Sequence, residues 1–490
     1  MHPDQIAETD PQRVAYRMEP SGEEVTYRAL VDASRRIASL LRKRGLRHGD
    51  VVGMLVENHP RFMEVAWAAQ RSGMRYTAIS TRLTASEVAY ILRDSGAAVL
   101  FTSAAMAEVA EAAAADAPGV REVLRVEDAA LDEPAEPHPD EREGTDLLYS
   151  SGTTGRPKGV VAELPLDPLG TPPTLIALVQ SLWNFGSDTI YLSPAPLYHA
   201  APLRFNMAVH RFGGTCVVME RFDALAALEL VERHRVTHTQ MVPTMFIRML
   251  KLPEADRCRF DLSSLQSVIH AAAPCPPPVK EQMIDWMGPV IHEYYSSTEG
   301  SLFTAITSQE ARERPGSVGR PLLGTPHILD EAGNELPPGE AGTIWSEGGV
   351  EFTYHNDPDK TAGARNDQGW TTVGDIGYLD DEGFLYLTDR KADMVISGGV
   401  NIYPREIEDQ LHAHPAILDA AVIGVPDPEW GESLRAFVVL RDGHQLTEPE
   451  VIAYCREHLA DFKRPRRVTF VAELPRNPTG KILKRALREQ

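Results

Sequence analysis

The stretch "EVTYRALVDASRRIASLLRKRGLRHGDVVGMLVEN", residues 24–58, joins a helix pattern to a strand pattern. Apolar residues in its first half recur three and four positions apart, which predicts an amphipathic helix that ends near Gly45. The run "VVGMLV" that follows is apolar throughout and predicts a buried strand. Residues 60–80 and 84–103 repeat this order. Alternating helices and apolar strands predict a mainly parallel sheet with helices on both faces.

The later sequence changes character in several places. Residues 104–118 are rich in alanine and predict a helix, whereas residues 126–146 are acidic, contain proline and predict a surface connection. Residues 261–278, "DLSSLQSVIHAAAPCPPP", predict a helix end, a strand and a turn stiffened by proline. Between residues 342 and 391, short runs of β-branched and aromatic residues predict a β-rich section.

We predict two domains, because 490 residues are too many for one hydrophobic core. Residues 1–389 form an α/β domain with mainly parallel, helix-covered sheets and a β-rich section. Residues 390–490 form a small, mobile α+β domain, since helix and strand patterns start again after "TDRKADM". The boundary lies near Asp389 and Arg390.

Composition restricts the classes of function. The chain is 43% hydrophobic and 24% charged, as in soluble globular proteins, and its net charge is −21. Nucleic-acid proteins and general membrane-surface binders need a basic face, so neither class is expected. No segment resembles a secretory signal or is long enough to cross a bilayer, which predicts a cytoplasmic enzyme without stable membrane insertion.

The cysteines and two of the histidines do not form a recognisable site. The cysteines are scattered without any C-x-x-C pair, which speaks against disulfides and a thiolate zinc site: Cys216, Cys258, Cys275 and Cys455. His234 and His238 have a spacing that suits a metal, but no carboxylate or cysteine pattern accompanies them, so we reject a metal site there. Cys275 lies between two prolines and has no catalytic context.

The stretch "LLYSSGTTGRPKGVV", residues 147–161, places small residues after an apolar run. Successive uncovered N–H groups form an anion-binding concavity, to which the hydroxyl groups and Lys158 would add donors and charge. A polyphosphate is the natural occupant. The stretch differs from the nucleotide loop G-x-x-x-x-G-K-[ST], because Pro157 precedes Lys158 and Gly159 follows it. A flexible surface loop is the alternative, which the ordered string S-S-G-T-T-G-R-P-K-G disfavours.

This stretch resembles the phosphate loop of the adenylate-forming superfamily, which comprises acyl-CoA synthetases, adenylation domains and luciferases. Four further segments resemble that family in the same order: "YYSSTEG" (294–300), "GWTTVGDIGYLDDEGFLYLTDRKADM" (369–394), "ISGGVNIYPREIE" (396–408) and "LPRNPTGKILKR" (474–485). The matches span nearly the whole chain. Within the superfamily, the sequence most resembles bacterial fatty-acyl-CoA synthetases.

The resemblance implies ATP, Mg²⁺ and coenzyme A as cofactors and assigns a role to each matching residue. The β- and γ-phosphates would be held by Ser150, Ser151, Gly152, Thr153, Thr154, Gly155 and Lys158. Adenosine would be held by Ala272, Ala273, Pro274, Tyr295, Asp375 and Arg390. The catalytic residues would be Thr298 at the α-phosphate, Glu299 as the Mg²⁺ ligand, and Lys481 at the carboxylate and the α-phosphate.

The other two implied subsites bind the acyl group and the thiol. The acyl pocket would be lined by His199, Gln240, Ala271 and Ser296. The channel for coenzyme A would be lined by Ser397, Gly398 and Gly399, since glycine leaves room for a narrow pantetheine arm. The basic cluster Lys463, Arg464, Arg466 and Arg467 either meets a phosphate of coenzyme A or forms a solvated edge.

Several of these residues also have ordinary explanations. Glu299 alone would be a loop acid, Asp375 a turn residue and Lys481 part of a soluble basic tail; their simultaneous match favours the functional roles. His199 is either a gate of the acyl pocket or a core histidine. Two departures from the family pattern are Ala392 at the hinge, where relatives have lysine or aspartate, and Ser296 in place of glycine.

The predicted reaction has two halves. A carboxylate attacks the α-phosphate of ATP to give an acyl-adenylate and pyrophosphate, and a thiol then displaces AMP. The acyl segments are apolar, which favours a medium- or long-chain fatty acid or a bulky terpenoid- or steroid-like acid. The alternatives are loading of a carrier-protein phosphopantetheine, a luciferase-type oxygenase and a nucleotide sensor. The expected partners are the acid, ATP and coenzyme A. The sequence leaves open whether the protein forms a homodimer.

Overall fold

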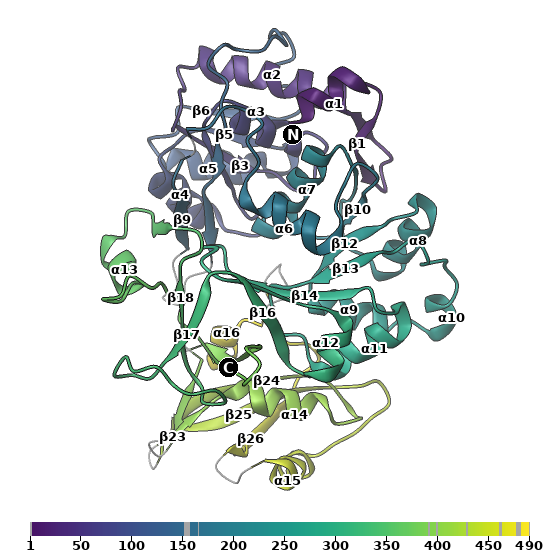
Figure 1. Ribbon diagram of the computed structural model, residues 1–490, viewed down its shortest axis with the longest axis vertical. Coiled ribbons are helices and arrows are strands. Elements are labelled where there is room, and N and C mark those ends of the chain that lie inside the picture. The colour runs from purple at the N-terminus through teal and green to yellow at the C-terminus, as the bar shows by residue number, and fades with distance from the viewer. Residues whose placement is uncertain are drawn as a thin grey trace. The chain divides into compact units, whose positions relative to one another are not determined.

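The computed structural model (Figure 1) describes residues 2–150, 157–164, 166–390, 393–397, 400–427, 430–459, 463–476 and 482–489. It divides into two compact units. The first unit holds residues 1–241, 251–269 and 350–362, and the second unit holds residues 242–250, 270–349 and 363–490. Each unit is described by itself. The predicted domain boundary at Asp389 and Arg390 stays a prediction.

The first unit combines two largely parallel groups of strands with a small antiparallel sheet. Its helices are α1 (Pro3–Thr9), α2 (Tyr27–Lys43), α3 (Phe62–Arg71), α4 (Ala85–Ser95), α5 (Ala107–Ala115), α6 (Thr174–Trp183), α7 (Ala200–Phe212), α8 (Ala224–His234), α10 (Glu254–Arg257) and α13 (Pro358–Gly363), with a 3₁₀ turn at Ala104–Met106. Its strands are β1 (Val14–Glu19), β2 (Glu24–Thr26), β3 (Val51–Leu55), β4 (Arg75–Ala78), β5 (Ala97–Thr102), β6 (Glu122–Arg125), β7 (Thr145–Asp146), β8 (Leu148–Ser150), β9 (Lys158–Ala162), β10 (Ile190–Ser193), β11 (Thr215–Met219), β12 (His238–Met241), β13 (Ser267–His270) and β19 (Phe352–Tyr354).

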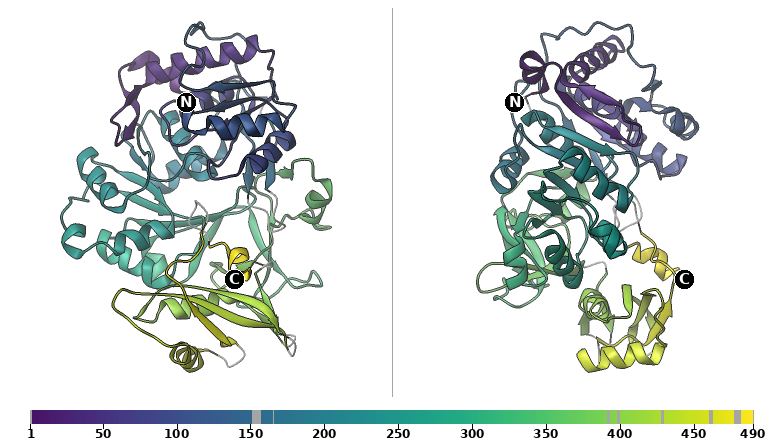
Figure 2. Two further views of the ribbon diagram at one scale, coloured as in Figure 1. Left: turned by 180° about the vertical axis from the view of Figure 1, so that it is seen from behind. Right: turned by 90° about the vertical axis from the view of Figure 1, so that its right-hand side faces the viewer.

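The predicted helix-covered parallel sheet is confirmed. Strands β6-β5-β3-β4-β7 lie in this order, and each neighbouring pair is parallel. The chain moves from β3 to β4 in one direction and returns past β3 to β5, so right-handed connections place α3 and α4 on opposite faces (Figure 2). Strand β3 is buried along its whole length, as its apolar run predicts.

Local signals set the ends of the first long helix. The Thr26 hydroxyl accepts a hydrogen bond from the amide of Ala29, which caps the N-terminus of α2. The helix ends at Lys43, and Gly45 follows with φ +83°, a left-handed conformation that favours glycine. The predicted end of this helix is therefore confirmed.

The other strands of the first unit form two further groups. Strand β1 lies between β11, to which it is parallel, and β2, to which it is antiparallel. Strand β10 lies between β11 and β12 and is parallel to both. The small antiparallel sheet has the order β19-β9-β8 and carries the two ends of the glycine-rich stretch.

The second unit is mainly antiparallel. Its helices are α9 (Pro243–Leu250), α11 (Pro277–Met287), α12 (Ser308–Glu313), α14 (Pro404–His412), α15 (Glu448–His458) and α16 (Lys484–Arg488). Its strands are β14 (Ile291–Ser296), β15 (Phe303–Ile306), β16 (Ser317–Leu323), β17 (Thr325–Leu329), β18 (Gly342–Glu347), β20 (Asp375–Leu379), β21 (Leu385–Arg390), β22 (Val395–Ser397), β23 (Val400–Ile402), β24 (Ile417–Asp427), β25 (Gly431–Leu440) and β26 (Arg467–Phe470).

The strands of the second unit form two groups. Strands β17-β18-β20-β21-β16-β15-β14 lie side by side. Of these, β18, β20 and β21 fall in the β-rich section predicted between residues 342 and 391, whereas the other four precede it. The C-terminal sheet has the order β23-β22-β25-β24, and β26 joins β25 in parallel. Helices α14 and α15 pack on this sheet through a core that includes Ile407, Leu411 and Val451. The predicted helices and strands of this region are confirmed.

The segment 261–278 differs from its prediction. Residues 261–265 form no helix, and the prolines after Cys275 do more than stiffen a turn, because Pro277 begins α11. Proline suits the first helical position, since its missing N–H group has no partner there anyway and its φ is already helical. The strand predicted in this segment is confirmed as β13.

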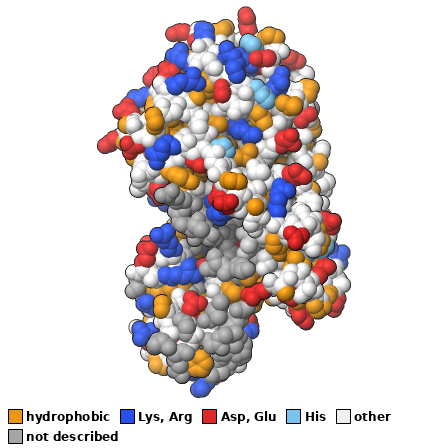
Figure 3. Space-filling view, turned by 90° about the vertical axis from the view of Figure 1, so that its left-hand side faces the viewer, with side chains coloured by type: hydrophobic (Ala, Val, Ile, Leu, Met, Phe, Trp, Pro, Cys, Tyr) orange, Lys and Arg blue, Asp and Glu red, His pale blue; other side chains and the backbone are white. Residues whose placement is uncertain are grey.

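The described surface is mixed in charge. On the face that Figure 3 shows, lysine and arginine side chains are interspersed with aspartate and glutamate. Among the described residues, no helix is long and apolar enough to span a bilayer. The cysteines are unpaired: Cys216, Cys275 and Cys455 are buried, and Cys258 is exposed.

Candidate active site

The glycine-rich stretch connects two paired strands of the first unit. Strands β8 and β9 are antiparallel, and their register places Ser150 opposite Lys158 and Tyr149 opposite Gly159. Residues 151–156, which include the predicted phosphate ligands Ser151, Gly152, Thr153, Thr154 and Gly155, lie outside the described residues. The two ends of the predicted phosphate loop are therefore neighbours in one hairpin.

A hydrogen-bonded cluster that the sequence analysis missed anchors this hairpin. The Tyr149 hydroxyl donates to the Asp94 carboxylate at 2.6 Å, and the side-chain amide of Asn356 donates to the Asp94 carbonyl at 2.9 Å. Burial and the carboxylate of Asp94 raise the pKa of Tyr149 well above its usual value, so the phenol stays protonated. The partners are distant in the chain, and no local sequence signal joins them.

Two further contacts hold the Lys158 side of the hairpin. A Cβ atom at Gly159 would lie 3.0 Å from both the Tyr149 ring and the His355 side chain, so glycine allows this close packing. The Lys158 ammonium group lies 5.7 Å from the centre of the Tyr354 ring. The aromatic ring and the hairpin together orient a cationic side chain at the end of the glycine-rich stretch.

In the second unit, one hydrogen bond and one strand pairing join three of the predicted adenosine residues, although β15, β16 and β21 separate the strands of Tyr295 and Asp375. The Tyr295 hydroxyl, at the end of β14, donates to the Asp375 carboxylate at 2.7 Å. Asp375 begins β20 and lies directly opposite Arg390 on β21 in the antiparallel register. Asp375 is buried and Tyr295 is half-buried. An aromatic ring and a carboxylate are thus held together by a direct hydrogen bond.

The predicted opposite wall of the adenine site follows β13. Ala271 is buried, whereas Ala272 and Pro274 are exposed and Ala273 is half-buried. Ala272 has φ +74°, a left-handed conformation that costs an alanine about 1 kcal/mol. The backbone therefore turns sharply at this wall, a feature that the sequence pattern does not predict.

Thr298 and Glu299 lie in the turn between β14 and β15. The Ser296 hydroxyl donates to the Leu302 carbonyl at 2.9 Å and closes this turn. Glu299 is buried, with 9% of its surface exposed, and Thr298 is half-buried. The Ser296 hydroxyl, predicted to line the acyl pocket, thus has a structural contact; its role toward a ligand stays a prediction.

His199 and Gln240 are the predicted acyl-pocket residues of the first unit. His199 is the N-cap of α7, and burial, together with Arg82, lowers its pKa to about 4, so the imidazole is neutral near pH 7. Gln240 on β12 is buried. Within the described part of the chain, Nε2 of His199 and Oε1 of Gln240 are buried without a hydrogen-bond partner. Such atoms remain available to a ligand or to water.

The remaining predictions fall at or beyond the edges of the described residues. Ser397 ends β22, whereas Gly398, Gly399, Lys481 and the hinge residue Ala392 lie outside. For Ser150 and Arg390 the structure describes the backbone but not the side chain.

His234 binds the Glu19 carboxylate at 2.8 Å, and His238 contacts the Trp183 carbonyl at 2.6 Å, so the two histidines have separate partners.

Two family matches cover most of the sequence. The family described as "AMP-binding enzyme" matches residues 3–351, and the "AMP-binding enzyme C-terminal domain" matches residues 406–481. The chain belongs to the AMP-binding enzyme family. The predicted membership of the adenylate-forming superfamily is thereby confirmed.

The names of relatives of this AMP-binding enzyme refer to different acids. Feruloyl-CoA synthase of Amycolatopsis sp. is 37% identical over 96% of this chain and 94% of its own length. Long-chain-fatty-acid–CoA ligase FadD13 of Mycobacterium tuberculosis is 35% identical over 99% and 97%. Fatty acid–[acyl-carrier-protein] ligase ScoC of Streptomyces coeruleorubidus is 33% identical over 96% and 92%.

The fold agrees with a nucleotide-bound relative. ATP-bound MatB of Rhodopseudomonas palustris superimposes with a TM-score of 0.88 and 30% identity, over 100% of this chain and 99% of that chain. The predicted fold class, the enzyme class of an AMP-forming acid–thiol ligase, and the use of ATP and coenzyme A are confirmed. The roles of individual residues are proposals.

A buried polar cluster lies behind the adenosine residues of this AMP-binding enzyme. Lys280 on α11 forms an ion pair with Glu293 on β14, and both side chains are almost fully buried. Fully buried His270 lies 3.9 Å from the Glu293 carboxylate and packs edge-on against Phe246. Glu293 precedes Tyr295 by two positions, so the cluster supports the strand that carries the predicted adenine ligand.

The free energy of unfolding is expected to depend on pH through His270. Burial lowers its pKa to about 4, so the unfolded chain binds a proton below pH 6.5 that the folded chain does not bind. Stability contributed by neutral His270 is thus present above pH 6.5 and falls by about 1.4 kcal/mol per unit as the pH decreases toward 4. Urea unfolding of wild type and His270→Phe between pH 4.5 and 7 should show a shallower slope for the variant; equal slopes would contradict this.

Proposed function

We propose that the enzyme activates a hydrophobic carboxylic acid as acyl-AMP, with release of pyrophosphate, and transfers the acyl group to coenzyme A. The observation that carries the proposal is that the Tyr295 hydroxyl binds the Asp375 carboxylate, while Asp375 lies opposite Arg390 on the paired strand. Tyr295 would lie against adenine, and Asp375 would accept hydrogen bonds from the ribose hydroxyls with help from Arg390. Ala272, Ala273 and Pro274 would form the other wall.

The triphosphate would be held mainly by backbone amides and hydroxyls. Ser150, Lys158 and the residues between them would bind the β- and γ-phosphates, and the joined ends of the β8–β9 hairpin support this role. Thr298 would contact the α-phosphate. Glu299 would hold Mg²⁺, which prefers carboxylate, phosphate and water oxygens.

Lys481 would act in the first half-reaction only. Its ammonium group would neutralise charge where the carboxylate meets the α-phosphate. We propose that residues 390–490 form a lid domain that turns between the half-reactions and exchanges Lys481 for the Ser397–Gly398–Gly399 segment. This gating would let one site perform two reactions in sequence.

The acid is proposed to be a medium- or long-chain fatty acid or a bulky terpenoid- or steroid-like acid. Neutral His199, Gln240 and Ala271 would line its pocket without a fixed charge, which disfavours charged substituents. Two relatives, named for a long-chain fatty acid and for ferulate, support an aliphatic or aromatic acid. The proposed location is the cytoplasm.

The acceptor is proposed to be free coenzyme A. Arg466 lies 5.0 Å from the centre of the exposed Trp430 ring, and Arg467 is exposed beside it, which suits a nucleotide phosphate next to a base. Lys463 is held by Glu406 at 2.6 Å and would be the least available member of the basic cluster. Loading of a carrier protein is the second candidate, because ScoC is named for that reaction.

One assay distinguishes these functions. The purified enzyme is incubated with ATP, Mg²⁺ and coenzyme A and with fatty, aromatic and polycyclic acids, and AMP and thioester are measured by mass spectrometry. AMP and acyl-CoA from a hydrophobic acid are the expected products. Adenylate that becomes thioester only when a phosphopantetheinyl carrier protein is added would favour the second candidate. Failure to form AMP with every acid would contradict both.

The Tyr149–Asp94 hydrogen bond predicts a selective effect on ATP. Tyr149→Phe should cost about 1 kcal/mol of stability and raise KM for ATP severalfold, because the hairpin loses an anchor beside the phosphate loop. KM for the acid should stay near its wild-type value. Tyr454→Phe is the control, since it removes a hydroxyl that accepts a hydrogen bond from Gln410 at 3.2 Å, far in sequence from the hairpin. Equal changes in both KM values would contradict the role.

A further inference from the structure

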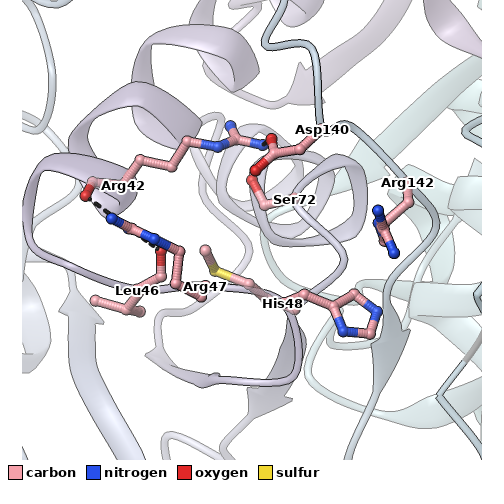
Figure 4. Close-up of a pocket in the computed structure, with 8 residues that line it drawn as sticks. Arg42, Leu46, Arg47, His48, Ser72, Asp140 and Arg142 are labelled. Atoms are coloured by element: carbon pink, nitrogen blue, oxygen red, sulfur yellow. Dashed lines mark hydrogen bonds and ion pairs between the residues drawn. The ribbon is translucent and has the colours of Figure 1, made fainter.

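A cavity of the first unit is lined by several basic side chains (Figure 4). It measures about 170 Å³ and is lined by Arg42, Leu46, Arg47, His48, Ser72, Met74, Asp140 and Arg142. These residues come from the connections that precede β3, β4 and β7, which are adjacent parallel strands. The cavity therefore lies at the amino ends of these strands. The glycine-rich stretch instead comes after β7 and β8 in the chain.

The charge of the cavity is positive although the chain is strongly acidic. Three guanidinium groups face one carboxylate, that of Asp140. Asp140 is engaged by Arg42 at 2.6 Å. Arg47 donates to the carbonyl groups of Arg42 and Leu46 at 3.0 and 2.8 Å, which orients its guanidinium at the end of α2. Arg42 thus has a carboxylate partner, whereas within the described ranges no ion pair is found for Arg47 or Arg142.

Arg142 and Ser72 provide donors without partners. In the ranges that the structure describes, the Arg142 guanidinium makes no hydrogen bond or ion pair. Ser72 is 4% exposed, and its buried hydroxyl likewise has no partner there. A buried donor without a partner is costly, so an acceptor inside the cavity would remove that cost.

Gly73 allows two of the basic side chains to approach each other. It has φ +65°, and a Cβ atom there would lie 2.5 Å from Cδ2 of His48 and 2.7 Å from Cγ of Arg142. Any larger residue would force these side chains apart. Figure 4 shows the Arg142 guanidinium and the imidazole of His48 near each other at one side of the cavity, with Arg42 and Arg47 at the other. The backbone is thus shaped to bring both groups to one place.

We propose that this cavity binds a phosphate group, carried by inorganic phosphate or by a small phosphate monoester. The planar fork of Arg142 would donate two hydrogen bonds to its oxygens, and Ser72 would donate a third. The volume is below the roughly 300–1,000 Å³ of sites that enclose drug-sized ligands, so a single phosphate group fits better than a whole nucleotide. The site is separate from the proposed triphosphate site and does not depend on that function.

Calorimetric titration of the full chain tests the site. Inorganic phosphate and glycerol 3-phosphate are titrated separately at constant ionic strength, with a non-hydrolysable ATP analogue and Mg²⁺ present to fill the nucleotide site. Arg142→Gln and Ser72→Ala are the test variants. Arg125→Gln is the matched control, since Arg125 is exposed on the same sheet and does not line the cavity.

Wild type and Arg125→Gln should bind phosphate alike, whereas Arg142→Gln should weaken binding roughly ten- to hundredfold. Ser72→Ala should weaken it less and keep the wild-type thermal stability, which separates a binding defect from misfolding. Tighter binding of glycerol 3-phosphate would identify an ester as the occupant, and tighter binding of inorganic phosphate would identify the free ion. Absence of binding to wild type, or wild-type affinity in both test variants, would overturn the proposal.

Discussion

Lys481→Ala should reduce acyl-adenylate formation by roughly a hundred- to thousandfold or more, while thioester formation from supplied acyl-AMP should largely survive. The adenylation step brings two anions together, and removal of one preorganised cation or donor has effects of this size. Thioester formation needs the anhydride and a thiol, so it does not require that charge. Pyrophosphate exchange reports the first half-reaction, and acyl-CoA from chemically prepared acyl-AMP reports the second.

Lys484→Ala is the matched control for this experiment. Lys484 lies three positions after Lys481, and its ammonium group is held by Glu408 at 3.0 Å. Its removal should leave both half-reactions near the wild-type rate. Equal loss of the two half-reactions in Lys481→Ala would contradict the assigned role, and a comparable loss in Lys484→Ala would indicate disruption of the whole segment.

The second large effect concerns stability. Lys280→Met should lower the free energy of unfolding by about 3–5 kcal/mol, because it leaves the buried carboxylate of Glu293 without its counter-ion. The double variant Lys280→Met/Glu293→Leu should recover most of this loss, since it removes both charges and fills the space with apolar atoms. Urea unfolding followed by circular dichroism measures the difference.

The neighbouring residue on α11 provides the control. Glu281 forms an ion pair with Arg312 at 3.0 Å, with both side chains about half exposed. Exposed ion pairs contribute at most about 1 kcal/mol, so Glu281→Gln should have a small effect. A loss in Lys280→Met no larger than that in Glu281→Gln would show that Glu293 finds another partner or binds a proton. A double variant as unstable as the single one would assign the loss to packing.

Much of the fold could be predicted because its signals are local. The helix of residues 27–43 has its apolar spacing, Thr26 as its cap and Gly45 just beyond its end within one short stretch. The β3 run is continuously apolar because helices cover both faces of its sheet. The prolines at the start of α11 predict a stiff turn rather than a helix start, because the same residue type serves both purposes.

The candidate site divides in the same way. Tyr295, Asp375 and Arg390 could be named from their motifs, but the hydrogen bond and the strand register that join them could not. Tyr149 lies inside the glycine-rich stretch, yet its partner Asp94 is 55 positions earlier in the chain. No periodicity relates residues at such a distance, because long-range pairing depends on how the sheets and helices assemble.

By itself, the sequence determined the class of this protein: the alternating helices and strands, the glycine-rich stretch with Lys158, and the ordered motifs that end at Lys481. Each of these features depends on residues that are neighbours in the chain, because secondary-structure propensity and motif spacing are local properties. The tertiary structure decided which groups meet: Tyr149 with Asp94, Lys280 with Glu293, and both Arg142 and His48 with the backbone at Gly73. Burial, charge pairing and orphaned donors arise only when distant segments pack together, so they can be read only from the folded chain.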